Sequence, residues 1–286
     1  VLAELLLGLP VAQSINRELL GRVASLKEAD IVPKLAFVRV GAREDDLSYE
    51  RGALKRCDAL GIETEILHFE EGDVDTQALI SQIKQLNARR DVHGVLMFRP
   101  LPAHIDQAAV CEVLDPAKDV DCLTSGSLFG VLAGVSRGFA PCTAEAVLAL
   151  LDFYGIALDG ADVAVIGRSL VIGKPVAALL CSRNATVTMC HTHTADLAAV
   201  CRDCDVIVAA AGHAKTVGLD CARDGQTIID VGINWDDENQ RLVGDVDFDA
   251  VEPVVSKISP VPRGVGSVTT AVLAKHVVEA AERTLA

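Results

Sequence analysis

The amino-acid sequence predicts an α/β protein of two domains, each built on a parallel sheet. In both halves of the chain, short apolar segments alternate with segments whose apolar residues recur at helical spacing. This alternation is typical of parallel strands joined by crossover helices. The length of 286 residues also suits two domains better than one.

The first half contains three expected strands. It begins with an amphipathic helix over 11–26, and Gly61 is expected to end a later helix. Ligands of parallel sheets bind beyond the carboxyl ends of the strands, so the loops there are expected to border one cleft. The expected strands are 34–41, 62–69 and 93–98, the helices are 46–60 and 75–87, and the loops are 41–49, 98–102 and 119–122.

The second half repeats the alternation after a glycine-rich connector over 126–138. A helix cap at 141–143 precedes an apolar helix, Thr194 is expected to cap a further helix, and a last helix covers 269–285. The expected strands are 163–166, 185–190, 205–210 and 226–234.

The segment 163–175, VAVIGRSLVIGKP, has the design of a nucleotide site. A buried strand runs into a turn opened by Gly167, Gly173 permits close backbone approach, and Pro175 suits the first turn of the next helix. Free N–H groups and the helix dipole at such a turn attract phosphates. The spacing differs from GxGxxG, so a plain strand-to-helix turn is the alternative.

The composition excludes several classes of protein. The net charge is −14 without a basic cluster, which argues against a nucleic-acid partner. No apolar run reaches membrane-spanning length, and residues 1–7 lack the features of a signal peptide. Nine cysteines without ligand spacing indicate reduced thiols in the cytoplasm and no metal site, and the CxxC at 201–204 is attributed to packing.

Several motifs together resemble the bifunctional methylenetetrahydrofolate dehydrogenase/cyclohydrolase family. The resemblance covers essentially the whole chain and is more specific in its second half. The motifs are GRSLVIGKP (167–175), ATVTMCHTHT (185–194), IIDVGIN (228–234), GDVDF (244–248), PVPRGVGSVTT (260–270) and, more weakly, Ser48-Tyr49, Pro100–Pro102, Lys118–Asp121 and Pro141–Thr143.

The resemblance implies a homodimer that acts in one-carbon metabolism. Each subunit would combine a folate-binding catalytic domain, 1–143 plus 267–286, with a Rossmann-like domain, 144–266, that binds NADP or NAD. The folate would lie in the cleft between them. The dehydrogenase oxidises 5,10-methylene-tetrahydrofolate to the 5,10-methenyl form, and the cyclohydrolase opens that ring to 10-formyl-tetrahydrofolate.

The same resemblance assigns residues to each ligand. Tyr49 would stack on the folate and Asp121 would pair with the pterin, as the two catalytic positions; the alternatives are a half-buried helix residue and a loop cap. Arg168 and Thr192 would suit the 2′-phosphate of NADP, unless Arg168 is only a solvated turn residue. The expected substrate-binding residues are Tyr49, Pro100, Leu101, Asp121, Arg263 and Gly264. The expected cofactor-binding residues are Thr143, Gly167, Arg168, Ser169, Ile172, Gly173, His191, Thr192, Ala211, Gly212, Ile233 and Thr270.

The departures from the family pattern concern mainly ring opening. The family lysine four residues after the tyrosine is here Ala53, and the family glutamine before the Pro-Leu-Pro loop is Phe98, beside Arg99. Hydrolysis needs groups that transfer protons, whereas hydride transfer needs mainly positioning. We therefore expect a dehydrogenase whose cyclohydrolase activity is lost.

Three further replacements lie in the same half or in the loop expected against the substrate. Cys122 and Arg263 stand where the family has glycines, and Ser267 where it has a proline. They leave two alternatives open: an NAD(P)-binding protein with a reshaped cleft, which acts on another substrate or is catalytically silent, and a purely structural dimer subunit.

Overall fold

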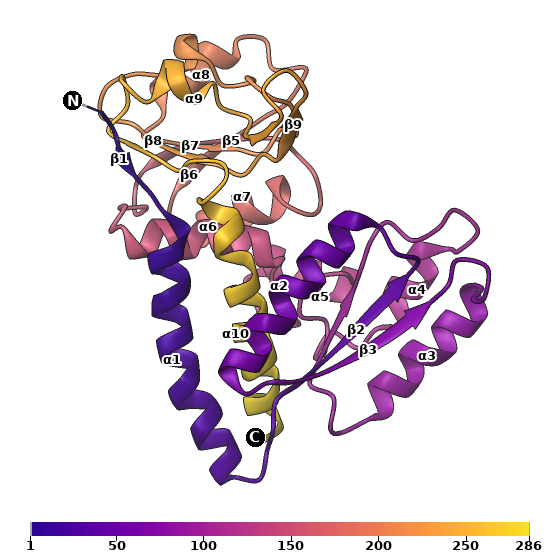
Figure 1. The fold of residues 1–286 in the computed structure, drawn as a ribbon. Coiled ribbons are helices and arrows are strands. Elements are labelled where there is room, and N and C mark those ends of the chain that lie inside the picture. Colours follow the sequence, from indigo (N-terminus) through magenta and orange to yellow (C-terminus); the bar gives the residue numbers. More distant parts are fainter. Residues whose placement is uncertain (1, 286) are drawn as a thin grey trace. The chain divides into compact units, whose positions relative to one another are not determined.

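The protein consists of two compact α/β units. The structure, a computed structural model, describes residues 2–285 (Figure 1). One unit, the nucleotide unit, comprises residues up to Gln13 and Thr143–Thr269. The other, the substrate unit, comprises Ser14–Cys142 and the residues from Thr270 onward.

The substrate unit is built on a three-stranded parallel sheet in the order β3-β2-β4. Its core is aliphatic, with Val38 and Val95 on neighbouring strands and Leu79 and Ile83 on the helix between β3 and β4. The strands are β2 (Lys34–Val40), β3 (Glu63–Phe69) and β4 (Gly94–Met97); the helices are α2 (Glu44–Leu60), α3 (Thr76–Ala88), α4 (Gln107–Val113), α5 (Ser125–Ala133) and α10 (Thr269–Glu282), followed by a 3-10 turn at Arg283–Leu285.

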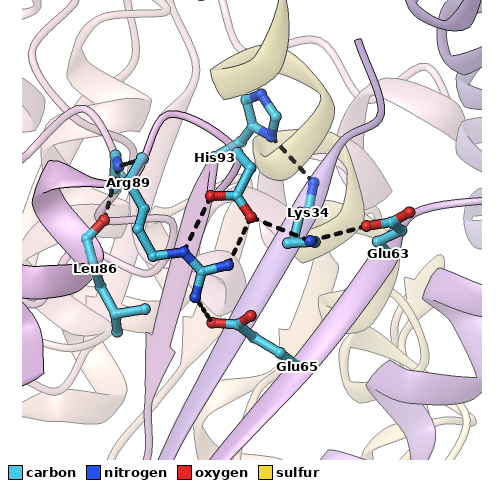
Figure 2. Close-up of polar contacts among 8 residues, drawn as sticks. Lys34, Glu63, Glu65, Leu86, Arg89 and His93 are labelled. Atoms are coloured by element: carbon cyan, nitrogen blue, oxygen red, sulfur yellow. Dashed lines mark hydrogen bonds and ion pairs between the residues drawn. The ribbon is translucent and has the colours of Figure 1, made fainter.

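An ion-pair network joins the amino ends of these strands (Figure 2). Lys34 Nζ lies 3.0 Å from Glu63 and 3.2 Å from Asp91. The Arg89 guanidinium lies 2.6 Å from Asp91 and 2.6 Å from Glu65. These charges compensate one another, and because Glu63 and Asp91 are exposed, each pair adds little to stability.

The nucleotide unit is built on a six-stranded parallel sheet in the order β1-β11-β8-β7-β5-β6. Its core joins Ile166, Ile207, Ile228 and Ile258, one from each of four strands. The strands are β1 (Glu4–Leu5), β5 (Asp162–Ile166), β6 (Thr186–Cys190), β7 (Val206–Ala209), β8 (Thr227–Asp230) and β11 (Lys257–Ile258), with a separate hairpin of β9 (Asn234–Asp236) and β10 (Arg241–Val243); the helices are α6 (Cys142–Phe153), α7 (Gly173–Cys181), α8 (Leu197–Asp203) and α9 (Phe248–Val251), with 3-10 turns at Leu219–Cys221 and Val265–Ser267. Helix α1 (Gly8–Glu28) contains the boundary between the units.

The expected alternation of strands and helices is confirmed, with four corrections. Residues up to Gln13 belong to the nucleotide unit and not to the substrate unit, because β1 pairs with β11. The expected connector over 126–138 contains helix α5, which Thr124 caps by accepting the Ser127 N–H. Asp196 and not Thr194 caps α8, by accepting the Ala199 N–H at 2.8 Å. The strand expected over 226–234 is shorter and ends at Asp230.

Two further expectations agree with the structure. Gly61 ends α2 in the left-handed conformation, at φ 72°. Cys201 and Cys204 are both buried in the core of the nucleotide unit, as expected of cysteines used for packing. Among the described residues, no helix is both long and apolar enough to cross a membrane.

Candidate functional site

The glycine turn after β5 lies at the point where the strand order of the sheet reverses. Strand β6 pairs with one edge of β5 and β7 with the other, so the chain returns across β5 between them. In open parallel sheets, dinucleotides bind beside this switch point, at the carboxyl ends of the strands. Gly167 follows β5 at that end, as predicted from its sequence.

The turn has no room for side chains at its glycines. Gly167 has φ +122°, and a Cβ there would lie 2.0 Å from the Ala210 carbonyl oxygen. A Cβ at Gly173 would lie 2.2 Å from the Gly167 carbonyl oxygen. The backbone after β5 is therefore packed directly against the loop after β7, which leaves a bare main-chain surface that suits a pyrophosphate.

Ser169 shapes this turn with its hydroxyl oxygen. The oxygen accepts the N–H groups of Ile172 at 3.1 Å and Gly173 at 3.4 Å, ahead of α7. The hydroxyl proton remains available to donate to a phosphate oxygen. Arg168 is exposed beside it, so its guanidinium can reach an anion in solvent.

His191 and Thr192 follow β6 at the same edge of the sheet. The His191 N–H donates to Thr194 Oγ1 at 2.9 Å, and its Nδ1 accepts the His193 N–H at 3.1 Å. In a neutral ring, Nε2 then carries the proton and is a donor. Thr192 is exposed, as a contact to a 2′-phosphate requires.

The loops after β7 and β8 carry the remaining expected cofactor residues of this edge. Ala211 and Gly212 are exposed, and the Ile233 side chain is 69% exposed. Behind these loops lie two carboxylates that the sequence analysis did not assign to the site, Asp230 and Asp245, which are 2% and 0% exposed. Both aspartates lie in motifs that the sequence analysis singled out, IIDVGIN and GDVDF, and these motifs were the sequence signal by which the two residues could have been found.

Burial raises the pKa of Asp230 to about 6, although three backbone N–H groups donate to its carboxylate. The folded protein thus binds this proton more tightly than the unfolded chain, whose aspartates titrate near 4. Stability contributed by the protonated form is therefore lost as pH rises from about 4 to about 6, by roughly 3 kcal/mol.

Denaturant unfolding of the wild type and of Asp230→Asn checks this pH dependence. The stability advantage of the wild type over the variant is expected to shrink as pH rises through that window. Trp235, the single tryptophan, lies in the nucleotide unit and reports its unfolding. Asp249→Asn, at an exposed carboxylate, is the control, and an equal slope in both variants would contradict the assignment.

In the substrate unit, Tyr49 lies in the second turn of α2 beside Phe98. The two rings are 6.3 Å apart at 80°, and the Phe98 ring lies 6.2 Å from Phe37 at 15°. Phe98 is 8% and Ala53 1% exposed. Lys55 is exposed on α2, about 200° round the helix from Ala53, as expected from the spacing.

Asp121 ends the motif Lys118-Asp-Val-Asp, whose other members have structural roles. Lys118 Nζ donates to the carbonyls of Leu86, Asn87 and Arg89 at the end of α3. Asp119 is fully buried and accepts the N–H groups of Leu123 and Thr124. The turn held in this way leaves Asp121 half-buried at the carboxyl side of the sheet.

The Asp121 carboxylate accepts the Cys142 N–H at 2.9 Å. Burial raises the pKa of this carboxyl, while that hydrogen bond and the charge of Arg99 oppose the rise. Asp121 therefore has both a local structural partner and a perturbed acidity, which is frequent in functional sites.

Two replacements of family glycines keep a backbone that favours glycine. Cys122 has φ 57° and Arg263 has φ 85°. Arg263 is exposed, and its backbone carbonyl accepts the Gly8 N–H at 2.8 Å. A left-handed conformation costs a residue with a Cβ about 1 kcal/mol.

Arg263→Gly is therefore expected to raise the free energy of unfolding by about 1 kcal/mol. Arg241→Gly, the same change in an exposed strand with ordinary backbone angles, is expected to lower it. Denaturant titrations of both variants test the prediction, and a loss of stability in Arg263→Gly would refute it.

The other expected site residues have mixed surroundings. Pro100 is exposed, whereas Leu101 packs in the core and its N–H donates to Gln107. Gly264 is buried in the loop before α10, and Thr143 is half-buried in the first turn of α6. Thr270 begins the part of α10 in the substrate unit and accepts Arg56 Nε at 2.8 Å.

A cavity of about 820 Å³ lies elsewhere, at the amino ends of β2 and β3. It is bordered by the ion-pair network of Figure 2, whose charges are paired with one another. This is the sheet edge opposite to the one where α/β proteins bind ligands, so we do not include the cavity in the site.

A parallel six-stranded sheet with a bare glycine turn at its switch point defines a dinucleotide-binding α/β protein. The sequence model "Tetrahydrofolate dehydrogenase/cyclohydrolase, NAD(P)-binding domain" matches residues 141–285, and that of the catalytic domain of the same family matches residues 6–121. The chain belongs to the tetrahydrofolate dehydrogenase/cyclohydrolase family, as its motifs indicated.

Relatives and solved structures agree with this assignment. The chain is 52% identical to "Bifunctional protein FolD" of Carboxydothermus hydrogenoformans over 98% of each chain, and 50% identical to that of Clostridioides difficile over 97% and 96%. The FolD crystal structure from Campylobacter jejuni is 35% identical with a TM-score of 0.95, and covers 99% of both chains. The Trypanosoma brucei FolD, complexed with NADP cofactor and inhibitor, is 34% identical with a TM-score of 0.92, and covers 100% of this chain and 99% of its own.

Proposed function

We propose that this chain oxidises 5,10-methylene-tetrahydrofolate to 5,10-methenyl-tetrahydrofolate with NADP, or alternatively NAD, and does not catalyse the following ring opening. The similar FolD proteins are named bifunctional, so the loss of one activity distinguishes this chain from them. The observation that carries the proposal is that two side chains unable to transfer a proton lie next to Tyr49: the Phe98 ring is in contact with the Tyr49 ring, and Ala53 follows one helical turn later.

The dehydrogenase step needs little acid–base chemistry. The methylene carbon between two nitrogens releases hydride readily, because a nitrogen lone pair stabilises the cation that forms. NADP, when bound, supplies the hydride acceptor, and the protein's task is to hold the two reactants face to face. The glycine turn with Arg168, Ser169 and Thr192 would bind the phosphates, and Ile233 would lie against the nicotinamide.

In the substrate unit, Tyr49 would stack on the pterin and Asp121 would accept its ring N–H and amino groups. Pro100, Leu101, Arg263 and Gly264 remain proposed contacts to the substrate, and Thr143 and Thr270 to the cofactor.

Ring opening requires a water molecule to attack the methenyl carbon and a proton to move to a leaving nitrogen. A side chain must accept and donate that proton. Phe98 and Ala53 cannot do so, and the Lys55 side chain lies on another face of α2. Arg99 beside Asp121 adds a permanent cation, but a guanidinium does not give up its proton.

The second candidate is an NAD(P)-binding protein with altered substrate residues, acting on another substrate or catalytically silent. Cys122 and Arg263, with side chains on glycine-type backbone, favour this candidate. One assay separates the two. The purified protein receives 5,10-methylene-tetrahydrofolate with NADP or with NAD, and reduced cofactor and methenyl product are followed at separate wavelengths.

Cofactor reduction without accelerated loss of the methenyl product is the expected result. Rapid loss of the methenyl product would refute the proposed loss of cyclohydrolase activity. Cofactor binding without reduction would support the second candidate. The homodimer and the cytoplasmic location are part of the same proposal and rest on the family resemblance; the mass in solution tests the dimer.

A further inference from the structure

Asp245 joins two loops of the nucleotide unit through one carboxylate. Its Oδ2 accepts the Gly212 N–H at 2.8 Å, from the loop after β7. Its Oδ1 accepts Asn234 Nδ2 at 2.9 Å, at the first residue of β9, where the loop after β8 ends. Asp245 has no exposed surface, so solvent does not compete for these bonds.

Asp230 holds Asp245 and its neighbours from behind. One Asp230 oxygen accepts the N–H groups of Gly232 at 3.0 Å and Asp245 at 2.9 Å, and the other accepts the Val246 N–H at 3.0 Å. The backbone of Asp245 is thus fixed by the carboxylate of Asp230, while the side chain of Asp245 reaches outward to the two loops.

Two glycines allow the carboxylates to approach the backbone so closely. A Cβ at Gly232 would lie 2.2 Å from Asp245 Oδ1, and a Cβ at Gly244 would lie 1.8 Å from Asp230 Oδ2. The glycines of both motifs therefore have a packing reason of their own, apart from any ligand contact. Because the packing is this close, a shift of either carboxylate would move the backbone next to it.

We propose that Asp245, fixed by Asp230, is a positioning residue that sets the nicotinamide half of the dinucleotide site. The proposal rests on the proposed function, in which Ile233 lies against the nicotinamide, and it adds Ala211 and Gly212 of the loop after β7 as the other wall. Gly212 bonds directly to Asp245, and Asn234 is the residue after Ile233. One carboxylate thus fixes the spacing of both walls without touching the ligand.

The adenosine half of the site contacts the loop after β7 but forms no direct hydrogen bond with Asp245. Gly167, Arg168, Ser169 and Thr192 follow β5 and β6, and none of their hydrogen bonds involves Asp245. A positioning role predicts selective weakening at the nicotinamide half. A role in stability alone would weaken both halves equally or neither.

The test compares two ligands in the variant Asp245→Asn. Asparagine has the shape of aspartate but only one acceptor oxygen. Its amide NH₂ group would therefore face either the Gly212 N–H or the Asn234 amide, and the hydrogen bond to that residue would be lost. NADP is expected to bind about tenfold more weakly, because a charge-assisted hydrogen bond is lost. Adenosine-2′,5′-bisphosphate, which lacks the nicotinamide, is expected to bind within twofold of the wild type. Calorimetry measures both dissociation constants.

Turnover adds a second readout. In Asp245→Asn, kcat is expected to fall at least tenfold while KM for the folate stays unchanged, because hydride transfer depends on nicotinamide geometry. Asp249→Asn removes an exposed carboxylate from the same unit and is the matched control. Asn234→Ala, at a half-exposed residue, removes the bonds of Asn234 Nδ2 to Asp245 and to the Gly244 carbonyl and leaves the bond between Gly212 and Asp245 in place. This variant decides the question if Asp245→Asn fails to fold.

Equal weakening of both ligands, or unchanged NADP binding in both variants, would overturn the inference. The binding comparison needs no turnover, so its outcome is separate from that of the proposed function. A wild type that binds NADP but does not oxidise methylene-tetrahydrofolate would refute that function and still leave the positioning role to be decided by the two ligands.

Discussion

The double variant Ala53→Lys/Phe98→Gln is expected to open the methenyl ring of 5,10-methenyl-tetrahydrofolate at least a hundredfold faster than the unchanged protein. General acid–base groups contribute about 10²-fold to 10⁴-fold to such steps. Lysine at 53 would stand one helical turn after Tyr49, and glutamine at 98 would replace the ring now in contact with Tyr49. Loss of methenyl absorbance, corrected for the uncatalysed rate, measures the effect.

Ala53→Lys alone is expected to leave ring opening unchanged. Position 53 is 1% exposed, so the amine of a lysine there would be buried. Phe98 would offer this amine no polar partner, and its charge would remain uncompensated. The control Asp58→Lys/Phe98→Gln adds a lysine on an exposed face of α2, about 140° round the helix from position 53. Robust hydrolysis by the single variant would show that glutamine at position 98 is not needed. Hydrolysis by the control would show that the position of the lysine amine on α2 does not matter.

Gly167→Ala is expected to lower the free energy of unfolding of the nucleotide unit by about 3 kcal/mol. About 1–2 kcal/mol comes from the backbone conformation and a similar amount from overpacking. The new Cβ would lie 2.0 Å from the Ala210 carbonyl oxygen, so the loop after β7 must move. Since that loop carries Ala211 and Gly212, NADP binding is expected to weaken at least a hundredfold.

Gly160→Ala separates the two contributions. Gly160 also has a positive φ, of 76°, but a Cβ there meets nothing within 4 Å. Its expected cost is about 1 kcal/mol, without an effect on NADP binding. Unfolding followed by Trp235 fluorescence and titration with NADP measure both variants. If Gly167→Ala behaved like Gly160→Ala, the close approach of the two loops would not matter for the site.

Local patterns were sufficient to predict most elements and the glycine turn. The strands over 34–40 and 162–166 follow from short apolar runs, the strand over 63–69 follows from its alternating pattern, and Gly167 follows from its place after one of them. The helix over 125–133 was missed because its glycines and serines have weak helical propensity. Its stability depends on the Thr124 cap and on the buried Asp119 behind it.

The family motifs of the second half also marked the NAD(P)-binding domain, but no motif explained the roles of its members. Lys118 and Asp119 belong to a motif of the expected substrate site, yet they cap a helix and hold a turn. Asp230 and Asp245 belong to motifs of the expected cofactor site and lie behind the surface. A motif marks a segment, whereas the orientation of each side chain depends on neighbours that are distant in sequence.

By itself, the sequence determined the alternating fold, the glycine turn and the absence of a lysine and a glutamine at positions 53 and 98, because each of these depends on residue type and local spacing. Only the tertiary structure decided that residues 2–13 join the nucleotide unit, through the pairing of β1 with β11. It alone placed the Phe98 ring against Tyr49 and the Asp245 carboxylate between two loops. These contacts join residues up to about 250 positions apart in the chain, and no local pattern carries that information.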